Sequence, residues 1–323
     1  MTQTPVVTIV TPTYDRAALL PDTIASILSQ TYRHFEYLVV DDGSTDETAD
    51  VVRRFADPRL TYARHDNMGE SATVNVGWAR ARGRYFAVVS SDDPMLPAWL
   101  ERSVAFLDSH PDAIVSYPDW HVIDEHGQVT RTITTYEYAA ERLVGWLHTI
   151  PGPGALIRRE RLRDVQRLRN PRYRYASDLD TWLMLAPRGP FARIPEVLAQ
   201  WRAHPTSLTL EPGSHARAQE FLDIARAFHE RPDVPDALRA LRPFTMSRAY
   251  WYASWSIMAA DATQADAWLR TSYAVSRHDP PGLPRELQRA LLPLPSQPLR
   301  WGARLARGLY ARAARLLHGR PRT

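Results

Sequence analysis

The sequence predicts an α/β protein with an open sheet flanked by helices, and three observations lead to this fold class. Nearly continuous apolar segments alternate with amphipathic ones over about the first 110 residues, the pattern of a sheet with right-handed crossover helices. Polar or acidic residues follow three of the apolar segments, in "TPTYD", "DDGSTDE" and "SSDD". Residues 211–276 have helical periodicity, which predicts an all-helical C-terminal extension.

The expected strands are short, apolar and rich in β-branched residues. The first, "VVTIVTPTY", has almost no polar interruption, which is typical of a strand buried on both faces of a sheet. Beyond residue 112 the pattern is less regular, and "PGPGALIRRERL" fits either a short strand or the start of a helix. We expect strands at residues 6–14, 35–44, 59–65, 84–93, 113–124 and 127–138.

The expected helices lie between these strands. Pro21 suits the first turn of the first helix, and Gly83 suits the end of the third. We expect helices at residues 19–31, 46–56, 69–83, 97–111 and 177–189. The chain then divides into three parts: an α/β domain at 1–210, a helical appendage at 211–280, and a proline-rich break with a basic segment at 281–323.

The composition excludes several kinds of chemistry. The chain has 323 residues and no cysteine, which rules out disulfides, cysteine-ligated metals and cysteine nucleophiles. It also has no lysine, so all 40 basic residues are arginine. P-loop nucleotide hydrolysis and Schiff-base catalysis both require a lysine and are therefore excluded.

The charge is distributed unevenly along the chain. Residues 281–323 carry nine Arg and one acid, a net charge of +8, whereas the preceding 280 residues carry a net charge of −4. We therefore expect no nucleic-acid partner for the main domain. In residues 299–318, Trp301, Leu305 and Leu309 share a helical face beside arginines. This segment predicts peripheral contact with an anionic membrane surface, or a helix packed on the appendage.

The ends of the chain and its apolar runs bear on localisation. The N-terminus "MTQTPVVTIV" lacks a basic region followed by an apolar stretch, so we expect no signal peptide. No run reaches the ~18 apolar residues of a membrane span. The expected location is the cytoplasm, with peripheral binding at the inner face of the membrane as the alternative for residues 299–318.

The three polar segments are expected at one edge of the sheet, where open α/β sheets bind their ligands. Backbone groups and the ring at Pro12, Thr13 and Tyr14 can hold a nucleobase, and the carboxylate of Asp42 can accept a base N–H. A helix-capping turn also explains "DDGSTDE". Adjacent acids such as Asp92 and the residue after it repel each other, so the pair suggests a cation or a hydrogen-bonded ligand rather than a simple turn.

Taken together, "TIVTPTYDRAALLPDTIASILSQTY", "FEYLVVDDGSTDET" and "HDNMGESATVNVGWARARGRYFAVVSSDD" resemble the family 2 glycosyltransferases. The resemblance covers roughly residues 5–210 and implies the GT-A fold, a Rossmann-like mixed sheet flanked by helices. It also implies inverting transfer of a sugar, of the hexosyltransferase type, from a nucleoside diphosphate. We expect a UDP-sugar, with guanosine or thymidine donors as alternatives, and a glycan or lipid-linked acceptor in cell-surface polysaccharide or glycolipid biosynthesis.

The resemblance assigns residues to the donor. Asp42 takes the base-contacting position, with the side chain of Asp41 less clearly placed. Asn67 and Gly69, followed by Asn75, occupy positions that shape the donor pocket in the family, although a turn also explains the first two. The residues expected to bind the nucleotide sugar are Pro12, Thr13, Tyr14, Asp42, Asn67, Gly69 and Asp92.

The segment "SSDD" takes the place of the metal-binding acidic motif of the family. Asp93 is expected to coordinate Mg²⁺ or Mn²⁺ and Asp92 to contact the ribose or help hold the metal, since oxygen ligands suit both ions. Ser91 precedes the pair, so the literal Asp-x-Asp spacing is absent. His204 in "WRAHPTSLT" is expected to be a further metal ligand or a pyrophosphate contact, and a structural histidine is the alternative.

The segment "YASDLDTWLML" resembles the acidic motif that supplies the catalytic base. Inversion requires a carboxylate to take the proton of the acceptor hydroxyl as the new bond forms. By motif position Asp178 is the base, Asp180 is the alternative, and a helix cap explains the segment without catalysis.

Three other functions are compatible with parts of the sequence. A non-catalytic nucleotide-sugar-binding protein could retain the fold without the chemistry. A nucleotidyltransferase is disfavoured because "TPTYDRAALL" contains no glycine, and a dinucleotide-binding dehydrogenase because no G-x-G-x-x-G follows the first strand.

Overall fold

The computed structural model describes residues 4–147 and 151–276, and the chain divides into two compact units. Within the described residues, the first unit holds 4–143 and 151–210 and the second holds 144–147 and 211–276. The proline-rich break and the basic segment expected at 281–323 lie outside the described residues, as does the predicted membrane-binding stretch 299–318.

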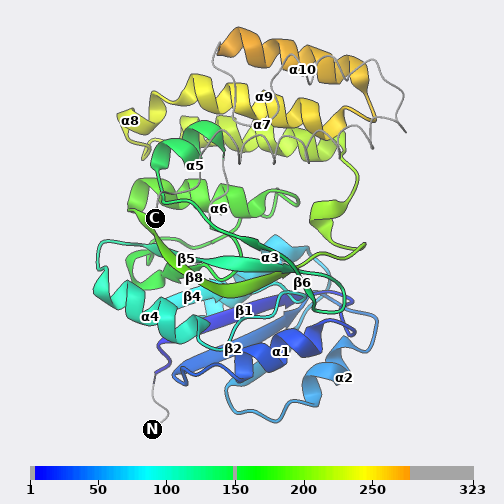
Figure 1. Ribbon diagram of the computed structural model, residues 1–323, viewed down its shortest axis with the longest axis vertical. Coiled ribbons are helices and arrows are strands. Elements are labelled where there is room, and N and C mark those ends of the chain that lie inside the picture. The colour runs from blue at the N-terminus through cyan, green and yellow to red at the C-terminus, as the bar shows by residue number, and fades with distance from the viewer. Residues whose placement is uncertain (1–3, 148–150, 277–323) are drawn as a thin grey trace. The chain divides into compact units, whose positions relative to one another are not determined.

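The first unit is built on a mixed sheet of eight strands within its described residues (Figure 1). The strand order is β3-β2-β1-β4-β7-β5-β6, and β8 pairs with β5. The first four strands run parallel, while β7 is antiparallel to both β4 and β5. This confirms the predicted α/β fold class. The strands are β1 (Val7–Thr13), β2 (Phe35–Asp41), β3 (Leu60–Arg64), β4 (Tyr85–Val88), β5 (Val115–Ile123), β6 (Val129–Ile133), β7 (Leu156–Arg158) and β8 (Phe191–Arg202).

Helices cover both faces of this sheet because successive strand residues point to opposite sides. Val7 and Ile9 of β1 face a core shared with α1, α2 and α4, whereas Val10 faces α3 on the other side. A Cβ on Gly77 of α3 would lie 2.5 Å from a methyl of Val10, so only glycine permits this close approach. The helices of this unit are α1 (Leu20–Leu28), α2 (Thr48–Arg53), α3 (Glu70–Arg80), α4 (Trp99–Ser109) and α6 (Ser177–Leu185), with 3₁₀ turns η1 (Arg159–Arg161), η2 (Ala186–Arg188) and η3 (Leu208–Leu210).

The twelve-residue strand β8 is the main element that the sequence pattern does not predict. Pro195 interrupts it and lacks the N–H that a sheet interior requires. The register with β5 shifts on both sides of Asp119, so irregular pairing absorbs the interruption. The residue that ends this strand is Arg202, two positions before His204. The "PGPGALIRRERL" segment is resolved as a strand, β7, followed by the turn η1.

The described part of the second unit is helical, as the periodicity predicts. Ser214 and Asp261 cap two of its helices by accepting a hydrogen bond from the backbone N–H three residues on. No helix in the described parts of the chain combines the length and the apolar character needed to span a bilayer. The helices are α7 (His215–Glu230), α8 (Asp236–Arg239), α9 (Arg242–Ile257) and α10 (Ala262–Val275), and α5 (Ala140–Trp146) runs from the first unit into the second.

Candidate active site

The three polar segments meet at the carboxyl edge of the parallel strands, as predicted. Thr13 pairs with Asp41 at the ends of β1 and β2, and the Asp42 backbone N–H donates to the Thr13 carbonyl at 2.8 Å. On the other side of β1, the Val89 N–H donates to the Val10 carbonyl at 2.9 Å, so the "SSDD" segment leaves β4 beside the end of β1. One edge of the sheet therefore carries all three segments.

The end of β1 presents two groups for a ligand. The ring of Tyr14 is 46% exposed just beyond the strand, while Pro12 is buried within it. The hydroxyl Oγ1 of Thr13 is buried and lacks a hydrogen-bond partner within the described residues. An orphaned buried hydroxyl is costly unless a ligand or water satisfies it. The positive φ of Asp15, 47°, turns the chain here, and its Oδ1 accepts from the Thr45 N–H at 2.7 Å.

The two acids after β2 have different surroundings. Asp41 is fully buried and its carboxylate accepts hydrogen bonds from the Ser44 N–H and the Tyr62 hydroxyl. Asp42 accepts from the backbone N–H groups of Met68 at 2.7 Å and Gly69 at 2.9 Å. Each carboxylate oxygen has a second lone pair, so these bonds leave Asp42 able to accept from a base.

The loop before α3 is shaped by the same carboxylate. Gly69 adopts φ +88°, which favours glycine, and its N–H points at Asp42 as the helix begins. Asn67 is exposed, and Met68 is 51% exposed. Asn67 and Gly69 are expected near the donor, and the structure adds that this loop binds Asp42 through the backbone N–H groups of Met68 and Gly69. A backbone contact of this kind leaves no side-chain signal in the sequence.

Asp92 and Asp93 point to different partners. The Oδ2 atom of Asp92 lies 2.8 Å from Nε2 of His204. Asp93 is 6% exposed, and its Oδ1 accepts from the Arg202 backbone N–H at 2.8 Å. Burial, reinforced by the neighbouring charge of Asp92, raises the pKa of Asp93 well above its ordinary value. His204, expected with Asp93 as a metal ligand, is hydrogen-bonded to Asp92 in this structure.

The guanidinium of Arg202 fixes this arrangement. It is 3% exposed and donates to the Asp92 carbonyl at 3.0 Å, while its Nη2 lies 2.9 Å from an Asp22 carboxylate oxygen. These bonds hold the Asp92 turn against the end of β8, so that His204 follows directly. Arg202 is therefore committed to the protein rather than to a phosphate.

The residues present offer a divalent cation two donors. Among the described residues, no cluster of three or more His, Asp or Glu side chains is arranged to hold a metal. The Asp92 oxygen and the His204 nitrogen are nevertheless adjacent, and Mn²⁺ accepts both donor types. Cations in nucleotide sites often use one or two protein ligands and complete their coordination with substrate phosphates and water. The pair fits a cation of that kind. His204 and Asp93 are both buried, and Asp93 differs in that its Oδ1 already accepts the Arg202 backbone N–H.

Asp178 lies in the first turn of α6. Its Oδ1 accepts from the Leu179 N–H at 2.8 Å. Burial raises the pKa of Asp178, and the Arg169 guanidinium opposes this increase. A carboxylate with a raised pKa is better matched to proton transfer near neutral pH. Asp180, the alternative base, is half-buried two residues further along α6. Its backbone N–H donates to the Ala176 carbonyl.

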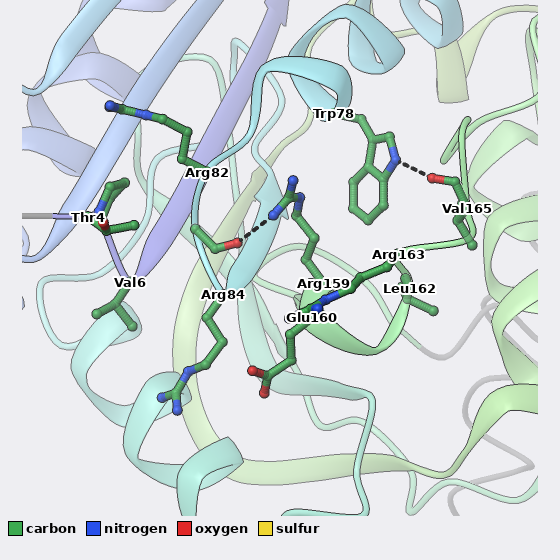
Figure 2. Close-up of a pocket in the computed structure, with 12 residues that line it drawn as sticks. Thr4, Val6, Trp78, Arg82, Arg84, Arg159, Glu160, Leu162, Arg163 and Val165 are labelled. Carbon is green, nitrogen blue, oxygen red and sulfur yellow. Dashed lines mark hydrogen bonds between the residues drawn. The ribbon is translucent and has the colours of Figure 1, made fainter.

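The loop that leads to Asp178 is tied to one face of α3. Side chains at positions i, i+4 and i+7 of this helix donate to carbonyls of the loop: Ser71 to Tyr173, Asn75 to Arg169 and Trp78 to Val165. Figure 2 shows the last of these bonds. The side-chain amide of Asn75, which the resemblance places at the donor pocket, is engaged by the Arg169 backbone.

The pocket drawn in Figure 2 lies elsewhere. It encloses about 850 Å³, and its lining residues include Val6 and Arg84, which immediately precede β1 and β4. These positions are at the amino ends of the strands, opposite the edge that carries Tyr14 and Asp92. Inside it, Arg159 donates to the Gly83 carbonyl at 3.0 Å. We therefore do not assign the donor to this pocket.

Comparison with known proteins identifies the family. Residues 8–166 match the sequence model of glycosyl transferase family 2. The chain is a family 2 glycosyltransferase. It is 28% identical over 217 residues to an uncharacterized glycosyltransferase of Haemophilus influenzae, covering 63% of this chain and 67% of the relative. It is 28% identical over 228 residues to the putative teichuronic acid biosynthesis glycosyltransferase TuaG of Bacillus subtilis, covering 68% and 87%.

Solved structures show that this glycosyltransferase has the GT-A fold. The structure of S. aureus TarS residues 1–349 in complex with UDP-GlcNAc superposes with a TM-score of 0.66 at 17% identity, covering 83% of this chain and 81% of that one. The mannosyltransferase PcManGT from Pyrobaculum calidifontis, in complex with GDP-Man and Mn²⁺, superposes with a TM-score of 0.55 at 21% identity, covering 95% and 88%. At these identities the likeness concerns the fold.

Proposed function

We propose that this glycosyltransferase transfers a sugar from a nucleoside-diphosphate donor to a hydroxyl of a glycan or lipid-linked acceptor in cell-surface polysaccharide or glycolipid assembly. Inversion at the anomeric carbon is part of the proposal. UDP is the proposed nucleotide, and GDP is the alternative. The name of TuaG supports the polysaccharide role, the TarS complex with UDP-GlcNAc supports the uridine donor, and the PcManGT complex supports the alternative.

One observation carries the proposal. Tyr14, Asp42 and the Asp92–His204 pair gather at the carboxyl edge of β1, β2 and β4, where open α/β sheets bind nucleotides. An exposed ring suits stacking on a base, and a carboxylate suits a base N–H. The pair of acid and histidine supplies ligands for a cation next to these groups.

The base end of the donor is proposed to lie against Asp42 and Tyr14. Asp42 is already oriented by the N–H groups of Met68 and Gly69, so its remaining lone pairs have a fixed direction. The unsatisfied Oγ1 of Thr13 gives a further polar contact. Preorganised groups of this kind lower the entropy cost of binding.

The diphosphate is proposed to lie near Asp92 and His204. We assign cation binding to this pair rather than to Asp93, because their donor atoms are 2.8 Å apart and Oδ1 of Asp93 is engaged by the Arg202 backbone N–H. When bound, a divalent cation neutralises negative charge on the departing nucleoside diphosphate. The role proposed for Asp93 is to accept the Arg202 N–H and thereby hold His204 opposite Asp92.

Asp178 is proposed to take the proton of the acceptor hydroxyl. The carboxylate accepts from the backbone N–H groups of Leu179 and of Asp178 itself, and these bonds leave oxygen lone pairs free to accept a proton. A free lone pair on a carboxyl with a raised pKa is what a general base requires.

A two-step experiment tests this proposal. A thermal-shift screen of UDP, GDP and dTDP, each with Mn²⁺ or with EDTA, is expected to identify one nucleotide whose stabilisation depends on Mn²⁺. Release of that nucleotide from its sugar conjugate is then measured for the wild type and for Asp178→Asn. The variant is expected to lose at least 100-fold in rate, the usual scale of general-base catalysis, with unchanged nucleotide affinity.

The outcomes separate the possibilities. Full activity of the Asp178→Asn variant would transfer the role of base to Asp180 or to another group. Nucleotide binding without turnover over a panel of donors and acceptors would favour a non-catalytic binding protein. No stabilisation by any nucleotide would count against the whole site.

Peripheral membrane contact through residues 299–318 is also proposed. It is supported by the apolar stripe and arginines of that segment in the sequence. Co-sedimentation of the full chain with vesicles containing anionic lipid, compared with a chain ending at residue 280, tests this proposal. Equal binding of the two chains would refute it.

A further inference from the structure

Arg169 is largely shielded from solvent near the proposed base, and it is held at both its backbone and its side chain. Its backbone N–H and carbonyl both bond to the side-chain amide of Asn75, at 2.9 and 2.7 Å. Its guanidinium donates to Glu70 at 2.6 Å and to the hydroxyl of Ser177 at 3.3 Å, and the side chain is only 14% exposed. The positively charged guanidinium of Arg169 is therefore held next to Ser177, the residue that precedes Asp178.

The charges around Asp178 come from these elements. Burial raises the pKa of Asp178, Arg169 lowers it, and Glu70 raises it again by its negative charge. Asp180 is a further acid on the same helix. No direct ion pair within 4 Å joins Arg169 to Asp178 among the described contacts, so the guanidinium acts on the carboxylate across space while its hydrogen bonds go elsewhere.

We propose that Arg169 is a positioning residue that keeps Asp178 in its carboxylate form, and that Glu70 and Asn75 hold Arg169 in place beside it. This inference rests on the proposed role of Asp178 as the base. A base that is too deeply buried remains protonated and cannot accept a proton, whereas a direct salt bridge would weaken its basicity. A guanidinium that lies close by, but is bonded to Glu70 and Ser177, keeps the pKa of Asp178 between these two extremes.

The geometry favours this role over simple structural support. The backbone bonds to Asn75 would hold the loop with any residue at position 169, because they involve only main-chain atoms of that residue. Support of the loop backbone therefore explains Asn75, whereas the guanidinium, which bridges Glu70 and Ser177, also places a positive charge beside Asp178. Its charge, rather than its backbone, is the feature that acts on Asp178.

The test is the pH profile of kcat/KM for nucleotide release from the donor selected by the thermal-shift screen. Activity falls below the pKa of a general base, which sets the acid limb of the profile. Arg169→Gln removes a positive charge, so the limb is expected to move to higher pH, with a loss on the order of ten-fold at acid pH and recovery at alkaline pH. Glu70→Gln removes a negative charge but retains a hydrogen-bonding side chain, so the limb is expected to move to lower pH.

Arg169→Lys is the matched control, because it keeps the charge and changes the hydrogen bonds. Its acid limb is expected to coincide with that of the wild type. Arg169→Gln and Glu70→Gln both break the same ion pair. If that pair had a purely structural role, the two variants would move the acid limb in the same direction, or neither would move it. Either result, or a Lys variant that behaves like Gln, would overturn the inference.

Asp178→Asn keeps the two proposals separable. If this variant retains activity, the role of Asp178 fails and the inference about Arg169 fails with it. If it is inactive and the Arg169→Gln limb does not move, the inference alone fails. Nucleotide affinity and unfolding temperature of each variant, compared with the wild type, show whether the site and the fold remain intact.

Discussion

Replacing Asn75 with Ala is expected to loosen the loop that carries the proposed base, without unfolding the sheet. The substitution removes two hydrogen bonds to the Arg169 backbone, at 2.7 and 2.9 Å. At a net value of about 1 kcal/mol each, the loss is about 2 kcal/mol, which is roughly a 30-fold increase in the equilibrium constant for local opening. The loss would be larger if water cannot reach the two freed backbone groups.

Amide hydrogen exchange followed by mass spectrometry measures this opening directly. Peptides from residues 163–176, which contain the Tyr173 N–H bonded to the Asn170 carbonyl, are expected to exchange roughly 30-fold faster in the variant. Ser71→Ala is the matched control: it removes one bond, to the Tyr173 carbonyl, and is expected to give roughly a five-fold effect. Unchanged exchange in the loop, or an equal increase throughout β1 and β2, would refute the reasoning.

Two further predictions concern other parts of the molecule. Asp92→Asn is expected to weaken Mn²⁺-dependent nucleotide binding by at least ten-fold in calorimetry, whereas Asp93→Asn is expected to retain most of it; the opposite ranking would return the cation to Asp93. In the second unit, burial, with Arg242 and Arg239 nearby, lowers the pKa of His229 from 6.5 to about 4. In the window from pH 7 to pH 4, only the histidine of the unfolded chain takes up a proton. The wild type is therefore expected to lose up to about 3 kcal/mol of unfolding free energy relative to His229→Leu over this window. A difference in urea unfolding that does not change with pH would contradict this.

The sequence predicts the edge of the sheet better than it predicts the contacts made there. Buried parallel strands have a local signature, and their carboxyl ends must meet at one edge, so the neighbourhood of Tyr14, Asp42 and Asp92 follows from pattern alone. Which of two adjacent acids faces a cation does not follow in this way. That choice depends on Arg202, the last residue of β8, and on His204 just beyond it, which lie about 110 residues further along the chain. The proline within β8 makes this strand hard to predict from the sequence.

The same limit applies to the loop before Asp178. Asn75 and Arg169 are 94 residues apart, and neither has a neighbour in the sequence that specifies the other. An asparagine in a helix has several ordinary explanations, and one arginine among 40 cannot be identified as functional by its residue type. Their pairing depends on the approach of α3 to the sheet, which Gly77 permits through a contact that no local pattern encodes.

Helix α3 connects the two halves of the proposed reaction. Its first residues are tied to Asp42 through the Gly69 N–H, and its middle is tied through Asn75 to the loop that carries the base. Gly69 and Asn75 are six residues apart, roughly 9 Å along a helix, and a helix packed against the sheet resists bending over that length. Inverting transfer requires the departing nucleotide and the base on opposite sides of one carbon, and misplacement by about 1 Å can cost roughly 100-fold in rate. A single rigid element bonded to both sides supplies that spacing, whereas two independent loops would each have to be ordered when the substrates bind.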